Sequence, residues 1–96
     1  MEFRASVDRL LRQIGHWEQG RWSAQGRADT VYALVQRLAD RAADAEQRPH
    51  RPVPRPSDLI LPDQLRVMAN DLEDTADGTL LKQATEEVDA VRYALG

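Results

Sequence analysis

The chain has 96 residues, a formal net charge of −3 and an apolar share of 42%. We expect one domain over residues 1–96, because chains divide into domains of roughly 100–200 residues each. The absence of cysteine excludes a disulfide framework and thiolate chemistry. Fully apolar runs such as Leu59 to Leu61 are far shorter than the roughly 20 residues of a membrane span. The first residues lack the apolar segment of a signal peptide, so we expect a cytoplasmic protein without a membrane partner.

Leu, Ile, Val and Phe together number 21 of the 96 residues, close to the range in which chains stay disordered. They recur at regular intervals, however, which favours a folded domain with a thin core. A small core leaves little surplus stability. The sequence therefore predicts a protein that associates with itself or with another protein.

Apolar residues repeat at spacings of three and four in four segments, which is the pattern of amphipathic helices. Turn and capping residues separate these segments. Gly20 is suited to end the first helix and Ser23 to cap the second. Pro62 suits the first turn of the third helix, and Asp77 can cap the fourth. The pattern predicts helices near residues 3–19, 24–47, 62–76 and 79–95.

Residues 48–58 hold four prolines, which exclude a helix and favour extended polyproline II. At about 3.1 Å per residue, ten such residues span about 30 Å, the length of a helix of about 20 residues. This linker could therefore run the length of a bundle and leave the second and third helices parallel. Short connections elsewhere predict antiparallel neighbours. We expect an all-α four-helix bundle with one long proline-rich crossover between the second and third helices.

Charge is distributed unevenly along the chain. Residues 1–56 carry ten arginines and seven acidic residues, whereas residues 57–96 carry three basic and nine acidic residues. We interpret this as attraction between the two halves of one bundle. The arginines of the linker are expected to stay solvated or to pair with the acidic second half.

No pattern typical of catalysis or of metal or cofactor binding stands out. The two histidines, His16 and His50, lie in different segments and form no helical ligand pair. The acidic group from Asp71 to Asp77 lacks the order of a calcium loop, and the five glycines form no phosphate loop. We predict a protein that is not an enzyme and binds no cofactor.

Six apolar or aromatic residues are candidates for a protein-binding surface. Four of them, Leu11, Tyr32, Val67 and Tyr93, lie away from the apolar stripe of their helix. The other two, Trp17 and Trp22, flank Gly20. The competing interpretation of the tryptophan pair is a plug at one end of the bundle. Arg48, Arg51 and Arg55 form the one basic patch, in the proline-rich linker.

We expect a protein-interaction or assembly module that binds a second copy of itself or another protein. One alternative is a nucleic-acid-associated regulator that uses the segment from Arg48 to Arg55, although an acidic chain makes nucleic acid the weaker expectation. Another is an accessory subunit of an enzyme. The linker itself could be a ligand for an aromatic groove or, as the favoured interpretation, a stiff spacer.

Overall fold

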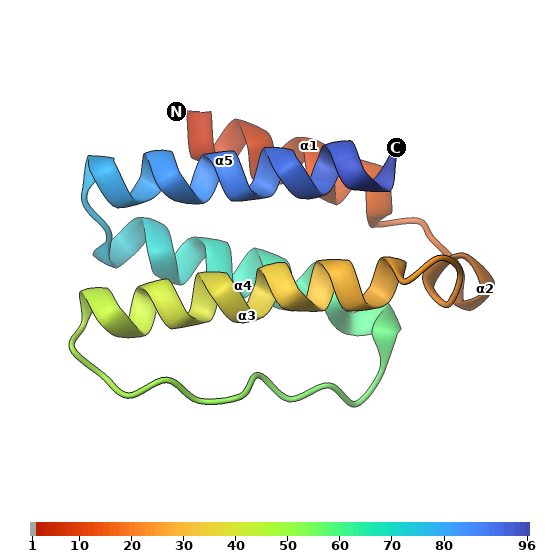
Figure 1. Ribbon diagram of the computed structural model, residues 1–96, viewed down its shortest axis with the longest axis horizontal. Helices are drawn as coiled ribbons and strands as arrows, with labels where there is room; N and C mark the ends of the chain where they lie inside the picture. Colours follow the sequence, from red (N-terminus) through yellow and green to blue (C-terminus); the bar gives the residue numbers. More distant parts are fainter. Residues whose placement is uncertain (1) are drawn as a thin grey trace.

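In the computed structural model, which describes residues 2–96, every regular element is a helix (Figure 1). Two short elements, α2 (Gln19–Trp22) and the 3-10 helix η1 (Asp58–Ile60), lie between the longer ones. The four long helices are α1 (Glu2–Ile14), α3 (Arg27–Ala45), α4 (Leu61–Thr75) and α5 (Gly78–Leu95). The predicted all-α helical bundle is confirmed.

The long helices occupy the four corners of the bundle. Helices α1 and α5 run in one direction and α3 and α4 in the other (Figure 1). The main packing pairs are α3 with α4, α1 with α5, α3 with α5 and α1 with α4. The helices joined by the shorter connections, α1 with α3 and α4 with α5, are therefore antiparallel, as expected, but they stand at diagonal corners and are not direct neighbours (Figure 1). Helices α3 and α4, joined by the long connection, are parallel and pack side by side (Figure 1). Each half of the chain packs mainly against the other half.

One apolar cluster fills the centre of the bundle. Its largest fully buried side chains come from α1, α2, α3 and α4: Trp22, Phe3, Leu10, Ile14, Leu34, Leu38, Leu61, Leu65, Leu72, Val7, Val31 and Val35. Helix α5 contributes the smaller side chains of Ala84, Val88 and Val91. Val53 joins this cluster from the segment between α3 and α4. Apart from Trp22 and Val53, these residues lie on the apolar stripes that predict the four long helices, so the hydrophobic effect that drives burial also accounts for the helical register.

Ion pairs cross between the two halves, as the charge distribution predicts. Arg4 of α1 pairs with Glu73 of α4. On the other side of the bundle, the guanidinium Nε atoms of Arg37 and Arg41 lie 3.1 and 2.5 Å from the two carboxylate oxygens of Glu87 of α5. Partly exposed pairs of this kind contribute little stability individually. They do favour this pairing of the helices over one that would bring like charges together.

The first helix is shorter than predicted. It ends at Ile14, not near residue 19, and Trp17 reaches the core from the loop that follows. A Cβ on Gly15 would lie 2.7 Å from the carbonyl oxygen of Leu11. Real Cβ atoms do not approach a carbonyl oxygen that closely. The tight turn at this position therefore suits glycine, which has no Cβ. Gly15, and not Gly20, marks the end of this helix.

The start of the second long helix also differs from the prediction. Gly20 lies inside α2, and the hydroxyl of Ser23 donates to the carbonyl oxygens of Gln19 and Gly20, which closes α2. Ser23 therefore does not cap α3. That helix begins after Gly26, which adopts a left-handed conformation with φ of 68°.

The other two helix starts agree with the sequence. Pro62 lies in the first turn of α4, where its missing N–H has no helical partner to lose. The carboxylate of Asp77 accepts a hydrogen bond of 2.9 Å from the backbone N–H of Leu80 and caps α5. No helix among residues 2–96 combines the length and apolar character needed to cross a membrane.

Candidate functional site

Residues 46–57, here called the crossover, contain no helix and run back along α3 from its end to the start of α4 (Figure 1). The crossover passes over the groove between α3 and α4, and Val53 is its one buried residue. Its other side chains lie on the surface. The path is set by contacts from one stripe of α3, defined by Asp29, Tyr32, Gln36, Asp40 and Asp44 (the α3 stripe).

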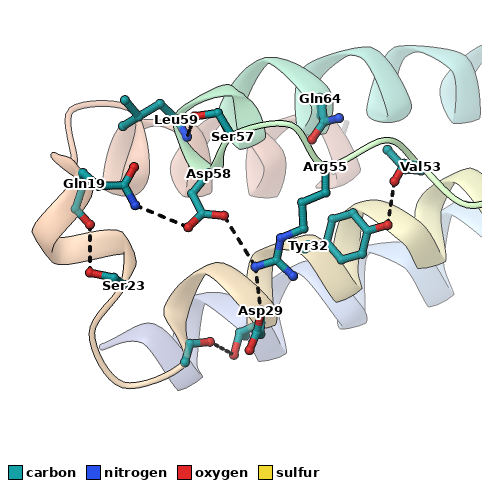
Figure 2. Close-up of polar contacts among 12 residues, drawn as sticks. Gln19, Ser23, Asp29, Tyr32, Val53, Arg55, Ser57, Asp58, Leu59 and Gln64 are labelled. Carbon is teal, nitrogen blue, oxygen red and sulfur yellow. Dashed lines mark hydrogen bonds and ion pairs between the residues drawn. The ribbon is translucent and has the colours of Figure 1, made fainter.

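The middle of the crossover is held by two hydrogen bonds to one amide side chain. Nε2 of Gln36 donates to the carbonyl oxygen of Arg51 over 2.9 Å, and the backbone N–H of Val53 donates to Oε1 of Gln36 over 2.8 Å. The hydroxyl of Tyr32 donates to the carbonyl oxygen of Val53 over 2.6 Å (Figure 2). On the α4 side, Nε2 of Gln64 donates to the carbonyl oxygen of Pro54 over 2.6 Å. An extended proline-rich strand has no internal hydrogen bonds, so these side chains satisfy its backbone.

The end of the crossover nearest α4 is fixed by Arg55. Its guanidinium stands 4.8 Å from the centre of the Tyr32 ring and 2.7 Å from the carboxylate of Asp29 (Figure 2). A longer contact of 3.5 Å reaches Asp58 of η1. The hydrogen bond to Asp29 raises the pKa of Arg55 further above its already high value. Arg55 therefore combines an ion pair with a cation–π contact, a combination that suits the planar guanidinium.

At the opposite end, His50 contacts α3, whereas the side chain of Arg48 pairs within the crossover. Arg48 pairs with Glu46 over 2.9 Å. Nε2 of His50 lies 2.6 Å from the carboxylate of Asp44, and its Nδ1 lies 3.7 Å from Asp40. The hydrogen bond to Asp44 raises the pKa of His50 above its ordinary value of 6.5, while desolvation lowers it and the charges of Asp40 and Asp44 add to the rise. The α3 stripe therefore contacts the crossover from one end to the other.

The pH dependence of this contact follows from the direction of the shift. Because the pKa of folded His50 is raised, its stabilising contact is fully present below about pH 6.5 and is lost as the pH rises through the raised value. We expect an NMR titration of the His50 ring to show a midpoint above 6.5. Asp44→Asn should move that midpoint back toward 6.5. An unchanged midpoint in Asp44→Asn would show that the imidazole and this carboxylate do not pair.

Gln36 provides a second check on the docking of the crossover. Gln36→Ala leaves the part-buried N–H of Val53 without its acceptor, so we expect the free energy of unfolding to fall by about 1–3 kcal/mol. Chemical denaturation followed by circular dichroism measures the change. Gln13→Ala, which removes the same kind of side chain from α1, is the matched control. Equal effects of the two substitutions would mean that Gln36 does not hold the crossover.

Exposed prolines and arginines follow one another along the crossover. We call this surface the Arg–Pro ridge and define it as Arg48, Pro49, Arg51, Pro52 and Pro54, all of which are exposed. Within residues 2–96, Arg51 forms no ion pair. The sequence predicts linker arginines that stay solvated or pair with the acidic second half. Arg51 is exposed and Arg55 reaches Asp58 of the second half, but the closest partners of Arg48 and Arg55 are Glu46 and Asp29 of the first half.

Four of the six predicted surface residues are used inside the molecule. Trp22 and Trp17 are buried and pack edge to face with ring centres 5.0 Å apart. Leu11 and Tyr32 are half-buried against the core. Prediction of these four as an exposed protein-binding surface is wrong, and the position of the tryptophans beside α2 agrees with the alternative of a plug at the end of the bundle.

The other two residues are exposed but lie on different faces. Val67 of α4 is 52% exposed and Tyr93 of α5 is 91% exposed. Because α4 and α5 occupy diagonal corners, their outward faces point away from each other. A third exposed apolar side chain, Leu59 in η1, was not predicted and points away from the crossover (Figure 2). Isolated apolar side chains are ordinary on protein surfaces, so none of these three residues defines a site.

The residues that the sequence analysis missed are the polar members of the α3 stripe and Gln64. Their signal was present in the sequence: Asp29, Gln36, Asp40 and Asp44 recur at helical spacing, and the basic segment follows directly after them. Within residues 2–96, no three metal-ligating side chains gather closely enough to hold an ion. Comparison of the chain with protein-family models, with curated proteins and with solved structures finds no match.

Proposed function

We propose that this protein is a protein-interaction module without catalytic chemistry of its own, and that the Arg–Pro ridge is its recognition surface. The observation that carries this proposal is the fixed, extended conformation of the crossover. The side chains of Tyr32 and Gln36 hold its backbone, while its prolines and Arg51 remain exposed. A ligand already held in polyproline II form loses little conformational entropy when a partner binds it.

The ridge also differs from the exposed apolar residues elsewhere on the molecule. Tyr93, Val67 and Leu59 stand apart, whereas the ridge places several prolines and arginines along one line. Proteins that recognise proline-rich segments do so through grooves lined by aromatic side chains. A partner with such a groove fits this surface.

Nucleic-acid binding through the same segment has weaker support. Arg48 and Arg55 are each paired with a carboxylate, and Asp40, Asp44 and Asp71 lie close to the crossover. A phosphate would have to compete with these groups, and neutralisation of several phosphates is the main source of affinity for nucleic acid. The protein partner is therefore the function that we propose.

A photo-crosslinking amino acid at position 52, introduced in the native host, tests the proposal. We expect a covalent adduct with one defined protein, and we expect Arg51→Glu to reduce its yield severalfold. The matched control is Arg12→Glu on the exposed face of α1, which makes the same change of charge far from the crossover and should leave the yield unchanged. No adduct, or an adduct equally sensitive to both substitutions, would overturn the proposal.

A further inference from the structure

A cavity of about 210 Å³ opens between the crossover and the two helices beneath it. Its floor is formed by Ala39, Ala42 and Ala43 of α3 and by Met68 of α4. Alanine side chains are too small to fill this space, so it stays open between α3 and the crossover. The prolines of the ridge and Arg51 form the rim.

The size of the cavity limits what can enter it. An apolar cavity of about 150 Å³ in another protein is large enough to hold benzene, whereas pockets for drug-sized molecules measure about 300–1,000 Å³. A volume of 210 Å³ therefore fits one aromatic side chain. The surroundings suit such a ring, because the floor is apolar and the rim carries prolines, the residues against which aromatic side chains pack when they recognise polyproline II segments.

The charges at the rim indicate where a charged group of the partner, next to such a ring, would be repelled or attracted. At one end, Arg48 already pairs with Glu46, and Asp71 lines the same end of the cavity. A second carboxylate there would meet Asp71. At the other end, Arg51 forms no ion pair within residues 2–96, so it offers a positive charge to an incoming acidic group.

We propose that the cavity receives an aromatic side chain of an acidic segment from the partner protein, with a carboxylate of that segment placed against Arg51. This inference rests on the proposed function, since it names the chemistry of the partner at the same surface. The ring supplies most of the contact. The carboxylate adds only about two- to fivefold to the affinity, because an ion pair at an exposed arginine contributes little. Its role is to favour acidic segments over neutral ones.

A small probe tests the cavity without knowledge of the partner. The probe is 3-phenylpropionate, which carries one aromatic ring and one carboxylate, added to the whole protein and followed by NMR at the methyl groups of Ala39 and Met68. We expect saturable shifts at both residues. Arg51→Gln should weaken binding about two- to fivefold, and 3-phenylpropionamide should bind the unchanged protein about as weakly. Arg12→Gln, on the exposed face of α1, should change nothing.

Ala39→Leu extends a larger side chain into the cavity and should abolish the shifts at Met68. Arg51 is exposed, so Arg51→Gln keeps the test valid even if Ala39→Leu disturbs the docking of the crossover. Absence of saturable shifts, shifts centred elsewhere, or equal binding to the protein with Arg51→Gln would overturn the inference. This result is separate from the cross-linking result: an adduct at position 52 without probe binding would leave the proposed function in place and remove only the cavity.

Discussion

Replacing Trp22 with alanine is expected to lower the free energy of unfolding by about 3–5 kcal/mol. Trp22 is 1% exposed and packs edge to face on Trp17 with an interplanar angle of 71°. The guanidinium groups of Arg21 and Arg27 lie 5.2 and 5.7 Å from the centre of the Trp17 ring. Loss of the indole would therefore leave a cavity at the end of the bundle and would remove the support of a second aromatic ring.

Urea denaturation followed by far-UV circular dichroism measures this loss. The total stability of a folded domain is roughly 5–15 kcal/mol, so the variant should lose a large share of it and unfold at a clearly lower urea concentration. Tyr93→Ala is the control, because Tyr93 is 91% exposed and its loss should cost less than about 0.5 kcal/mol. A cost below about 1 kcal/mol for Trp22→Ala would contradict the assignment of the tryptophan pair to the core.

Deleting residues 48–53 is expected to abolish the monomeric bundle. The six residues left between Ala45 and Asp58 would bridge at most about 25 Å, because seven Cα–Cα steps of at most about 3.6 Å join the two ends. The 19 residues of α3, along which the crossover must return, measure about 28 Å. Since α4 could no longer begin beside the start of α3, the two halves of one chain could not pack on each other.

The halves would then pack across two chains or remain unfolded. Each long helix finds its main packing partners in the other half, so exchange of halves between two copies is the available route to a buried core. Analytical ultracentrifugation should show a dimer, or circular dichroism a loss of helix. Replacing the same six residues with glycine and serine preserves the reach and should keep the subunit as compact as the unchanged protein. A stable, folded monomer after the deletion would contradict the parallel arrangement of α3 and α4.

The helices themselves could be predicted because their register is set by local periodicity. The stripe that includes Leu34 and Leu38 identifies α3, and the Asp77 cap identifies the start of α5. The end of α1 could not be predicted in the same way. Trp17 continues the apolar spacing of the helix but reaches the core from a loop, because its contact with Trp22 is tertiary and leaves no periodic signal in the sequence.

The candidate site was predicted in part. The prolines identify an extended segment, and its arginines mark it as basic, but the composition gives no indication of where such a segment docks. That depends on Gln36 and Tyr32, whose hydrogen bonds to the backbone of the crossover form only when the bundle brings α3 against it. The diagonal placement of α4 and α5 is likewise a property of the whole packing, so the separation of Val67 from Tyr93 could not be derived from either helix alone.

Amide hydrogen exchange within the crossover tests the central claim, that this segment is held in place on α3. The N–H of Val53 donates to Gln36, whereas no acceptor is seen for the N–H of Arg51 within residues 2–96. We predict that the Val53 amide exchanges at least about tenfold more slowly than the Arg51 amide, as expected for a hydrogen bond of ordinary strength, and that Gln36→Ala removes the difference. Equal, fast exchange at both amides in the unchanged protein would show that the crossover is not docked and that the Arg–Pro ridge is not preformed.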